Sequence, residues 1–409
     1  MRTIELREQQ TTPCVLSRSE VALLAGAQRL HNGRVLSVRL RSGGDDVYDI
    51  RTGSVVGTLV WPGLQVLITP KINLENVFFL LGFRGGLAQW RDEAFPYERE
   101  PNFLRALAWA FDAEVRRALR YGIARDYLAR EDTLVAPRGR IDLARQFRVW
   151  QDRAFPVACQ FQEYTEDIPL NRLIKAANWR LRRVPGLGDE LARRLGMTIS
   201  GFTDVSAAEY SPASIPELTF TRLNRQWEPA ARVAALILRQ EALRDRTGTA
   251  VGTSFTVDMN SLFEKFVEEV VQEEAGRAGL QLQPQAPVRL TDRVMMLPDL
   301  VLRSRSHRVA VGDAKYIEVD PDGWPNANLY QLLAYCIALG LPRGLLIYAG
   351  PRPLDVQQLK RADVELEVMG IDMSGRPEHV LAHARAAARR LVEHAHMREV
   401  ANPQIRESR

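Results

Sequence analysis

Two acidic residues and one lysine occur at a spacing that could support hydrolytic chemistry. Asp299 follows Pro298 inside an apolar segment, where a strand would normally need the backbone N–H that proline lacks. Asp313 and Lys315 end a second apolar segment and are two residues apart. Because side chains alternate along a strand, Asp313 and Lys315 should project from the same face. A short connection between the two segments would bring both carboxylates and the ammonium group together.

Such a group of side chains suits metal-assisted hydrolysis of a phosphodiester bond. Mg²⁺ prefers oxygen ligands and is commonly held by one or two carboxylates together with waters and the substrate. Asp299 and Asp313 supply these carboxylates, and the carbonyl of Ala314 is an additional candidate ligand. Lys315 would orient the attacking water and neutralise the charge that develops on the phosphate. We therefore expect Mg²⁺ as the cofactor, with Mn²⁺ as an alternative.

Two flanking segments contribute further candidates. Glu264 is surrounded by Leu, Phe and Val residues, so its side of a predicted helix lies close to the core, where it could bind the metal or orient a metal-bound water. Downstream, Gln331 and Tyr335 are one helical turn apart and share a face. Their polar groups could contact the scissile strand or the site lysine. Buried polar residues that only satisfy each other by hydrogen bonding are an equally good interpretation.

The elements expected to hold these residues alternate between helices and strands. The polar segment from Arg303 to His307 predicts a hairpin turn that sets Asp299 beside Asp313. The apolar periodicity predicts a helix over 260–278, strands over 280–288, 295–302 and 308–316, a further helix, strands over 344–348 and 364–371, and a helix over 377–396. This order is typical of an α/β domain.

The rest of the chain divides into two regions of different composition. Residues 1–95 alternate short apolar runs with Gly and Asp turns, which predicts a β-rich N-terminal module. Residues 96–246 show helical periodicity, which predicts a mainly helical, arginine-rich middle region. With residues 247–409 as the C-terminal α/β domain, the predicted fold class is multidomain α+β.

The arginines of the middle region have two interpretations. They could follow a phosphate backbone, but a solvated helical face with salt bridges is favoured. The residues concerned are Arg116, Arg117, Arg120, Arg125, Arg130, Arg138, Arg140, Arg145 and Arg148.

Composition excludes several classes of protein. A chain of 409 residues with 46% hydrophobic and 26% charged residues is typical of a globular protein with more than one core. The net charge of +5 is compatible with a polyanionic partner. No apolar run is long enough to span a membrane and the first residues do not resemble a secretory signal, so we expect a cytoplasmic protein. The 3 cysteines are far apart, which argues against a disulfide framework or a zinc site.

Histidines near the C-terminus could suggest another metal site. His379 and His383 are one turn apart on the last predicted helix, and His394 and His396 lie near its end. Because no third ligand is nearby, we interpret them as surface residues of that helix.

The ordered set of residues around the predicted site resembles a known superfamily. The set consists of Glu264, Pro298-Asp299, Asp313-Ala314-Lys315 and Gln331-x-x-x-Tyr335. It resembles the PD-(D/E)xK nucleases, in the arrangement found in the RecB-like and Cas4-like branch. The resemblance implies a restriction-endonuclease-like domain with a mixed central sheet, and it implies catalytic or metal-binding roles for these residues.

Short segments upstream of the site also match a family pattern. They are Trp61-Pro62-Gly63, Ile68-Thr69-Pro70-Lys71-Ile72, Tyr121-Gly122-Ile123-Ala124-Arg125-Asp126-Tyr127, Arg138-Gly139-Arg140-Ile141 and Asn171-Arg172-Leu173-Ile174. These segments resemble the McrC family, the nuclease subunits of McrBC restriction systems, which are specific for 5-methylcytosine. The likeness spans nearly the whole chain.

The McrC resemblance implies a subunit that acts with a partner. Members pair with McrB, a ring-forming AAA+ GTPase that reads modified cytosine and moves double-stranded DNA, and residues 1–95 would dock into this ring and stimulate GTP hydrolysis. GTP would then act only through the partner. The sequence agrees in one respect, because none of its lysines is followed by Ser or Thr and a Walker A loop is therefore missing. A second copy of the nuclease domain is a further candidate partner for double-strand cleavage, and no membrane is expected.

Two other functions are compatible with the sequence. The chain could be a non-enzymatic activator or scaffold of an AAA+ ring, although the intact Asp299, Asp313 and Lys315 argue against this. It could also be a self-sufficient DNA repair nuclease of the RecB-like or Cas4-like kind. In that case the β-rich module would bind DNA, and the purified chain would cut with Mg²⁺ alone.

Overall fold

The computed structural model describes most of the chain, in segments separated by short gaps. They are residues 1–30, 35–42, 46–83, 103–149, 156–184, 186–239, 242–244, 251–317, 326–359 and 363–402. Two compact units are present: one comprises Met1–Phe103, Leu243–Ala250 and Thr256–Arg409, and the other Leu104–Ala242 and Val251–Phe255. The boundaries expected at residues 95 and 246 lie outside the described segments, so the division into three domains stays a prediction.

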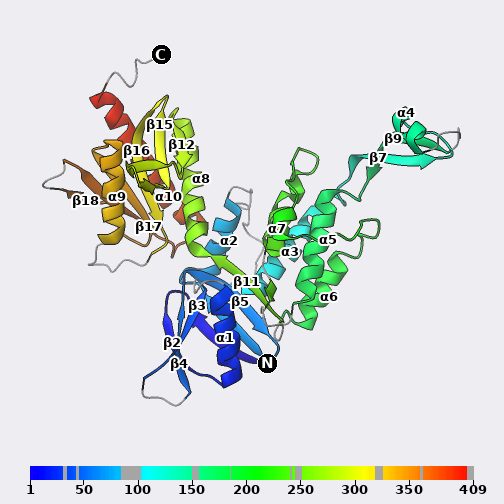
Figure 1. The fold of residues 1–409 in the computed structure, drawn as a ribbon, viewed down its shortest axis with the longest axis horizontal. Helices are drawn as coiled ribbons and strands as arrows, with labels where there is room; N and C mark the ends of the chain where they lie inside the picture. Colours follow the sequence, from blue (N-terminus) through cyan, green and yellow to red (C-terminus); the bar gives the residue numbers. More distant parts are fainter. Residues whose placement is uncertain are drawn as a thin grey trace. The chain divides into compact units, whose positions relative to one another are not determined.

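The N-terminal residues take part in two sheets (Figure 1). Long apolar runs form the inner strands, since every residue of β5 (Val55–Trp61) and all but the last residue of β6 (Leu64–Thr69) are buried. One sheet has the order β1 (Arg2–Arg7), β6, β5, β11 (Val251–Asp258) and β10 (Ala242–Arg244). The other has the order β2 (Thr11–Val15), β4 (Val47–Thr52) and β3 (Leu36–Leu40), with α1 (Arg18–Leu30) against β3 and α2 (Leu74–Gly82) following β6. The N-terminal region is thus rich in β-structure, as expected.

The C-terminal part of the same unit is built on a 6-stranded sheet. Its strand order is β12 (Gln281–Pro284), β15 (Leu300–Ser304), β16 (His307–Lys315), β17 (Arg343–Ala349), β19 (Glu365–Ile371) and β18 (Asp355–Gln358). The pairs β16–β17 and β17–β19 are parallel, whereas β12–β15, β15–β16 and β18–β19 are antiparallel. The sheet is therefore mixed, which agrees with what the resemblance implied.

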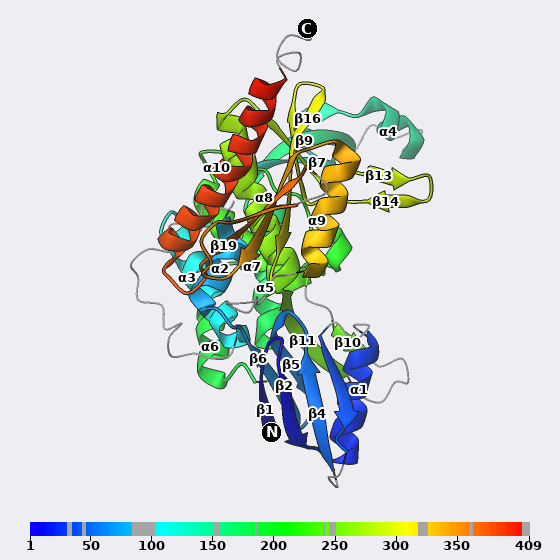
Figure 2. The ribbon, with the colours of Figure 1, turned by 90° about the vertical axis from the view of Figure 1, so that its left-hand side faces the viewer.

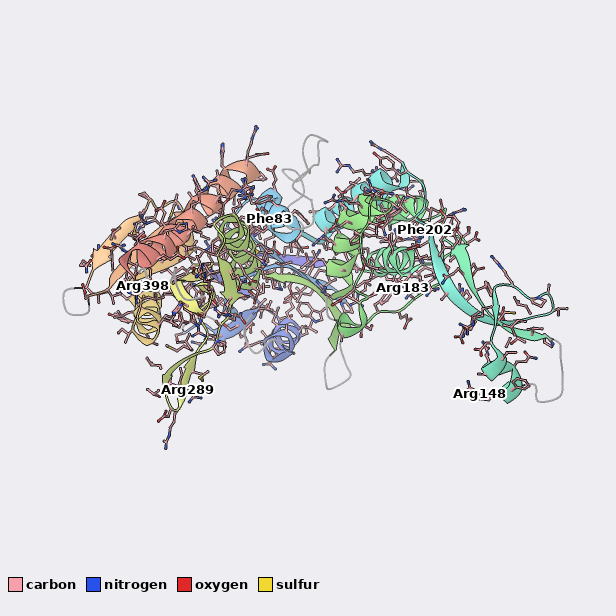
Figure 3. The ribbon with its side chains drawn as sticks, turned by 90° about the horizontal axis from the view of Figure 1, so that it is seen from above. Phe83, Arg148, Arg183, Phe202, Arg289 and Arg398 are labelled. Carbon is pink, nitrogen blue, oxygen red and sulfur yellow. The ribbon has the colours of Figure 1, made fainter. Side chains whose placement is uncertain are left out.

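Two strands that were predicted as continuous are interrupted. Segment 280–288 forms β12 and breaks before Val288, and segment 295–302 breaks between Met296 and Leu300; a separate hairpin of β13 (Val288–Thr291) and β14 (Val294–Met296) lies between β12 and β15. The breaks have local causes, because Gln285 adopts a positive φ of 47° and Pro298 cannot donate to a strand ladder. Figure 3 shows Arg289 of this hairpin pointing away from the sheet.

Helices cover both faces of the C-terminal sheet (Figure 2). α8 (Met259–Arg277) and α10 (Pro377–Ala401) lie against one face, and α9 (Asn326–Leu339) lies against the other. Pro377 occupies the first helical position of α10, where its missing N–H costs no hydrogen bond. This arrangement encloses the central strands β16 and β17 between two layers of helices.

Alternation along β16 decides which side chains meet which helix. Val311 joins the core against α9, whereas Gly312 faces Leu391 of α10. Because every second side chain of a strand lies on the same face, the side chains of Asp313 and Lys315 lie on the same face of the sheet as Val311, which is the face covered by α9.

The second unit is mainly helical but contains a sheet that the sequence did not predict. Its helices are α3 (Phe103–Leu119), α4 (Leu143–Val149), α5 (Pro169–Arg182), α6 (Asp189–Thr198) and α7 (Glu228–Arg239), with short 3₁₀ turns at Pro212–Ser214 and Arg225–Trp227. The antiparallel sheet has the order β7 (Asp126–Leu134), β9 (Val157–Thr165) and β8 (Arg140–Ile141). No residue of β7 is buried. Its sequence therefore did not need to alternate apolar and polar residues, and without that alternation the strand could not be recognised from the sequence.

Several arginines of this unit form ion pairs, as expected for a solvated helical face with salt bridges, but Arg130 and Arg140 lie on the strands β7 and β8, so the face is only partly helical. Arg116 lies 2.8 Å from Asp112, and Arg125 lies 2.6 Å from Glu166. Ion pairs with acidic neighbours are also formed by Arg117, Arg130 and Arg145.

The last helix corrects one prediction. His379 and His383 are exposed as expected, but His394 is buried, with its Nε2 atom 2.9 Å from a carboxylate oxygen of Glu367. Arg390 donates to both oxygens of the same carboxylate at 2.7 Å. Burial alone would raise the pKa of Glu367, but the close contact with His394 and the hydrogen bonds from Arg390 outweigh burial and lower it to about 2. The prediction for His394 was wrong because α10 packs one of its faces against the sheet over most of its length.

Two remaining features concern membranes and cysteines. Within the described segments, no helix combines the length and apolar character needed to cross a membrane. Cys14, Cys159 and Cys336 all carry free thiols; Cys159 and Cys336 are buried and Cys14 is half-buried.

Candidate active site

The strands β15 and β16 form the hairpin that carries the predicted site. Their antiparallel register pairs Leu300 with Gly312, and the next step of this register sets Asp299 opposite Asp313. Asp299 lies just before the first residue of the ladder, so the preceding Pro298 removes no hydrogen bond from the sheet. The hairpin predicted from the sequence is therefore confirmed.

Lys315 links the two carboxylates. Its Nζ atom lies 2.8 Å from Asp299 Oδ2 and 2.9 Å from Asp313 Oδ2. Asp299 Oδ2 also accepts a 3.1 Å hydrogen bond from the backbone N–H of Ala314. The Lys315 side chain is 22% exposed and the Asp299 side chain 16%, so solvent reaches the cluster on one side.

Asp313 is the most unusual group of the cluster. Its side chain is 1% exposed, and neither of its oxygens accepts a hydrogen bond of normal geometry from the described residues. Burial, followed by the negative charge of Asp299, raises its pKa to about 7. A buried carboxylate with no hydrogen-bond donor is costly unless positive charge compensates it. The Lys315 ammonium supplies part of this compensation, and a divalent cation would supply the rest.

Lys315 is held in its charged form. Burial alone would lower its pKa, but the charges of Asp313 and Asp299 outweigh burial and raise it. An ammonium group that stays protonated near neutral pH can orient water and stabilise negative charge, but it cannot act as a general base. The environment of Lys315 is therefore compatible with the electrostatic role expected for it.

Glu264 approaches the cluster from α8. One of its oxygens lies 3.9 Å from Lys315 Nζ, and its side chain is 30% exposed. Burial and the charge of Asp299 raise its pKa. The start of α8 is fixed by Asp258, whose carboxylate accepts hydrogen bonds from two backbone N–H groups of the first turn. Glu264 therefore lies at the rim of the cluster, at a distance that a bridging water could span.

Gln331 and Tyr335 of α9 bond to each other. Gln331 Nε2 donates to the Tyr335 hydroxyl at 2.5 Å. Tyr335 is buried, and burial together with the charge of Asp313 raises its pKa to about 12, so the phenol stays neutral within electrostatic reach of the cluster. Among the described residues, neither side chain hydrogen-bonds to the carboxylates or to the lysine. The functional and the structural interpretation of this pair both stay predictions.

The donor set suits a hard cation held by few protein ligands. In the part of the chain that the structure describes, no three Asp, Glu, His or Cys side chains form a complete metal cage. Mg²⁺ does not need one, because it keeps several waters and binds through one or two carboxylates. The N–H and C=O of a strand residue point to the same side, so the Ala314 carbonyl turns toward the carboxylate that its N–H contacts. Asp299, Asp313 and this carbonyl together fit such a cation.

A second buried carboxylate beside the site strand was missed by the sequence analysis. Glu8 is 1% exposed and accepts 2.7 Å hydrogen bonds from the Tyr316 hydroxyl and from the backbone N–H of Lys71. The Lys71 ammonium lies 4.2 Å from the centre of the Tyr316 ring. Burial raises the pKa of Glu8. Because Tyr316 directly follows Lys315, these contacts join the N-terminal sheet to the end of the site strand.

Comparison with known proteins identifies a family. The family model described as "McrBC 5-methylcytosine restriction system component" matches residues 50–349. The chain is also 24% identical over 307 residues to an Escherichia coli K12 protein named "Type IV methyl-directed restriction enzyme EcoKMcrBC". That alignment covers 68% of this chain and 86% of the relative.

The fold matches a solved structure as well. The TM-score is 0.62 at 18% sequence identity, over 95% of this chain and 100% of the matched chain. That structure is described as a refined half-complex from a tetradecameric assembly of Thermococcus gammatolerans McrB AAA+ hexamers with bound McrC. The structural likeness supports the architecture, and the family match covers well over half of the sequence. The chain therefore belongs to the family of McrBC 5-methylcytosine restriction system components.

Proposed function

We propose that this chain is a Mg²⁺-dependent DNA endonuclease of the PD-(D/E)xK type and the nuclease subunit of a restriction system directed at modified cytosine. The observation that carries the proposal is the convergence of Asp299 and Asp313 on Lys315, with contacts of 2.8 and 2.9 Å. Membership of the McrBC family supports the restriction role. The raised pKa of Asp313, and the lack of a hydrogen bond of normal geometry to it among the described residues, support the binding of a cation by this cluster.

Each residue has one task in the proposed reaction. Asp299 and Asp313, with the carbonyl of Ala314, hold the cation. When bound, the cation supplies Lewis acidity and a more acidic water next to the scissile phosphate. Lys315 stays protonated, orients the attacking water and offsets the negative charge that grows on the phosphate oxygens. Glu264 holds a water at the rim of the site.

We also propose that an AAA+ partner controls the cutting. The solved structure that this fold matches contains McrB AAA+ hexamers with bound McrC, and we extend that arrangement to the present chain. Because no lysine of the sequence precedes Ser or Thr, GTP would be hydrolysed by the McrB-like ring. Residues 1–95 would dock to this ring, double-stranded DNA would be the substrate, and a second copy would allow both strands to be cut. This assembly would act in the cytoplasm.

Cleavage of plasmid DNA tests the proposal. Methylated and unmethylated plasmids are incubated with the full chain and Mg²⁺, with and without its McrB-like partner and GTP. We expect double-strand cuts only in methylated plasmid and only when the partner and GTP are present. Lys315→Ala should abolish the cuts and leave the stimulation of partner GTP hydrolysis intact.

Lys265→Ala provides a matched control, because Lys265 neighbours Glu264 on α8 but is exposed. It should cut like the wild type. Normal cutting by Lys315→Ala would contradict the assigned site, and loss of both cutting and GTPase stimulation would contradict the division of labour. Efficient cutting by the chain with Mg²⁺ alone would favour a self-sufficient nuclease. GTPase stimulation by a wild type that cuts no DNA would favour a scaffold.

A further inference from the structure

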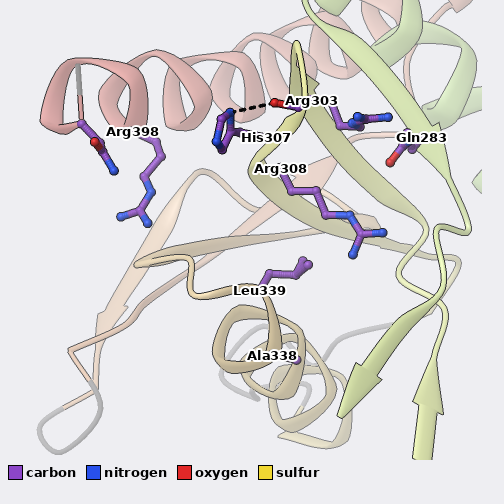
Figure 4. A pocket seen from close by; sticks show the side chains of 9 residues that line it. Gln283, Arg303, His307, Arg308, Ala338, Leu339 and Arg398 are labelled. Carbon is purple, nitrogen blue, oxygen red and sulfur yellow. Dashed lines mark hydrogen bonds between the residues drawn. The ribbon is translucent and has the colours of Figure 1, made fainter. Parts of the chain in front are cut away.

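A basic hollow lies at the turn end of the β15–β16 hairpin, at the opposite end of β16 from its carboxylate (Figure 4). Its volume is about 680 Å³. The lining comes from this hairpin, from β12 and from the C-terminal ends of α9 and α10. Its charged groups are Arg303, Arg308 and Arg398, and His307 lies between them.

The positive charge of the hollow is not balanced by the described residues. No Asp or Glu lines it, and none of Arg303, Arg308 and Arg398 forms an ion pair within the described segments. By contrast, Arg390 lies on the same helix as Arg398 and pairs with Glu367 at 2.7 Å. Like charges around one hollow repel each other, so an anion bound among them would relieve this repulsion.

Two of the guanidinium groups are oriented by backbone carbonyls. Arg398 Nη2 donates to the carbonyl of Gly340 at 3.1 Å, and Arg308 Nη2 donates to that of Pro287 at 3.4 Å. A guanidinium carries five N–H donors, so one such contact sets its direction and leaves other donors for a ligand. Planar forks of this kind match the oxygens of phosphate groups.

The hollow and the carboxylate cluster lie along the same elements. Arg303 follows Asp299 by four residues, which corresponds to about 13 Å along a strand. α9 carries Tyr335, which lies within electrostatic reach of the cluster, and Leu339, which lines the hollow. Each strand of duplex DNA carries a phosphate about every 3.4 Å along the axis, so this separation spans about four base pairs.

We propose that this hollow binds phosphates of the DNA backbone at a distance from the bond that is cut. The inference rests on the proposed nuclease function and adds a second DNA contact to it. Contacts to phosphate position a duplex without reading its sequence. The hollow would therefore hold the duplex in place while the carboxylate cluster meets the scissile bond.

The salt dependence of DNA binding tests this proposal. The full chain in EDTA is titrated against a short fluorescein-labelled DNA duplex at several NaCl concentrations, and fluorescence anisotropy gives the Kd. Each phosphate contact contributes about one unit to the slope of log affinity against log salt. The triple variant R303Q/R308Q/R398Q should bind about tenfold or more weakly at low salt, with a slope smaller by about two to three units.

A pair of single variants on α10 provides the control. Arg398 lies near the end of this helix and Arg376 is the residue before its start. Arg398→Gln should lower the slope by about one unit, and Arg376→Gln should bind DNA like the wild type. Thermal unfolding shows whether every variant is folded.

Three outcomes would overturn the inference. If the triple variant binds DNA with wild-type affinity and slope, the hollow does not contact DNA, and the nuclease proposal stands. If inorganic phosphate stabilises the wild type but not the triple variant while DNA binding is unchanged, the hollow binds small anions only. If the wild type neither binds nor cuts DNA, the proposed function fails together with this inference.

Discussion

The two ends of the β15–β16 hairpin have opposite chemistry. At one end, Asp313 is buried and short of hydrogen-bond donors, with Asp299 and Lys315 beside it. At the other end, Arg303 and Arg308 line an open hollow and have no ion-pair partner among the described residues. One end suits a cation and the other an anion. A single pair of strands would thus fix the distance between the proposed metal site and the proposed phosphate contact.

The two ends also differ in how firmly they are anchored. The carboxylate end continues into Tyr316, whose hydroxyl donates to the buried Glu8 at 2.7 Å. The arginine end is an exposed turn in which Arg305 adopts a positive φ of 52°. A metal site requires fixed distances between its ligands, whereas a contact to phosphate tolerates adjustment. The difference in anchoring therefore agrees with the difference in proposed task.

Removal of the buried carboxylate should have the largest effect. Asp313→Asn keeps the shape of the side chain but removes its charge, and it should lower kcat for plasmid cleavage about 1000-fold. Arg398→Gln should leave kcat near the wild-type value and raise only the DNA concentration at which cleavage reaches half its maximal rate. Cleavage kinetics with partner and GTP measure both. If the kcat of Asp313→Asn lies within about tenfold of the wild-type value, the carboxylate end would not be the catalytic end of the hairpin.

Loss of the anchor at the carboxylate end should have the next largest effect. Tyr316→Phe leaves the buried Glu8 with one donor fewer, so the free energy of unfolding should fall by on the order of 1–3 kcal/mol. Urea unfolding followed by circular dichroism measures this change. Tyr48→Phe is the control, because Tyr48 is half-buried in β4, and an equal loss there would mean that the bond to Glu8 adds no stability.

The pH dependence of stability should show a smaller effect, since Lys315 already offsets part of the charge. The pKa of Asp313 is raised from an ordinary value near 4 to about 7, so between these values the metal-free folded chain binds more protons than the unfolded chain. The stability that the folded chain gains from protonated Asp313 is therefore lost as pH rises through that window. Asp313→Asn does not titrate, so its Tm relative to wild type should rise from about pH 5 to about pH 8 in EDTA. A constant difference would mean that Asp313 ionises normally.

The smallest effect is expected at the Gln331–Tyr335 pair. Tyr335→Phe removes a hydroxyl that lies within electrostatic reach of Asp313 but does not bond to it, so kcat should fall only several-fold, or about 1 kcal/mol. Tyr330→Phe on the same helix is the control, since Tyr330 is 70% exposed. If both variants retain full activity, the pair has a structural role only.

The convergence of the site residues could be predicted because it depends on local patterns. The alternation of side chains aligned Asp313 with Lys315, and the short polar turn set Asp299 opposite Asp313. Both follow from residues within a single hairpin. The catalytic roles of these residues, and those of Glu264 and Gln331, stay predictions.

The features that were missed depend on contacts between distant segments. Glu8 and Tyr316 are 308 residues apart, and no local pattern pairs them. β7 carries charged and mostly exposed side chains and is a strand only because β9 pairs with it. His394 is buried because α10 packs against the sheet, where its side chain meets Glu367 of β19. In each case the structure is decided by a partner that lies outside the local sequence.

Titration with Mn²⁺, followed by electron paramagnetic resonance of the free ion, tests the central claim most directly. The carboxylate end of the hairpin should bind one Mn²⁺ per chain in the wild type and in Arg398→Gln. Asp313→Asn should lose this binding while remaining folded. Equal binding of Mn²⁺ by Asp313→Asn and the wild type would contradict the account, because the buried carboxylate would then not be a ligand of the cation.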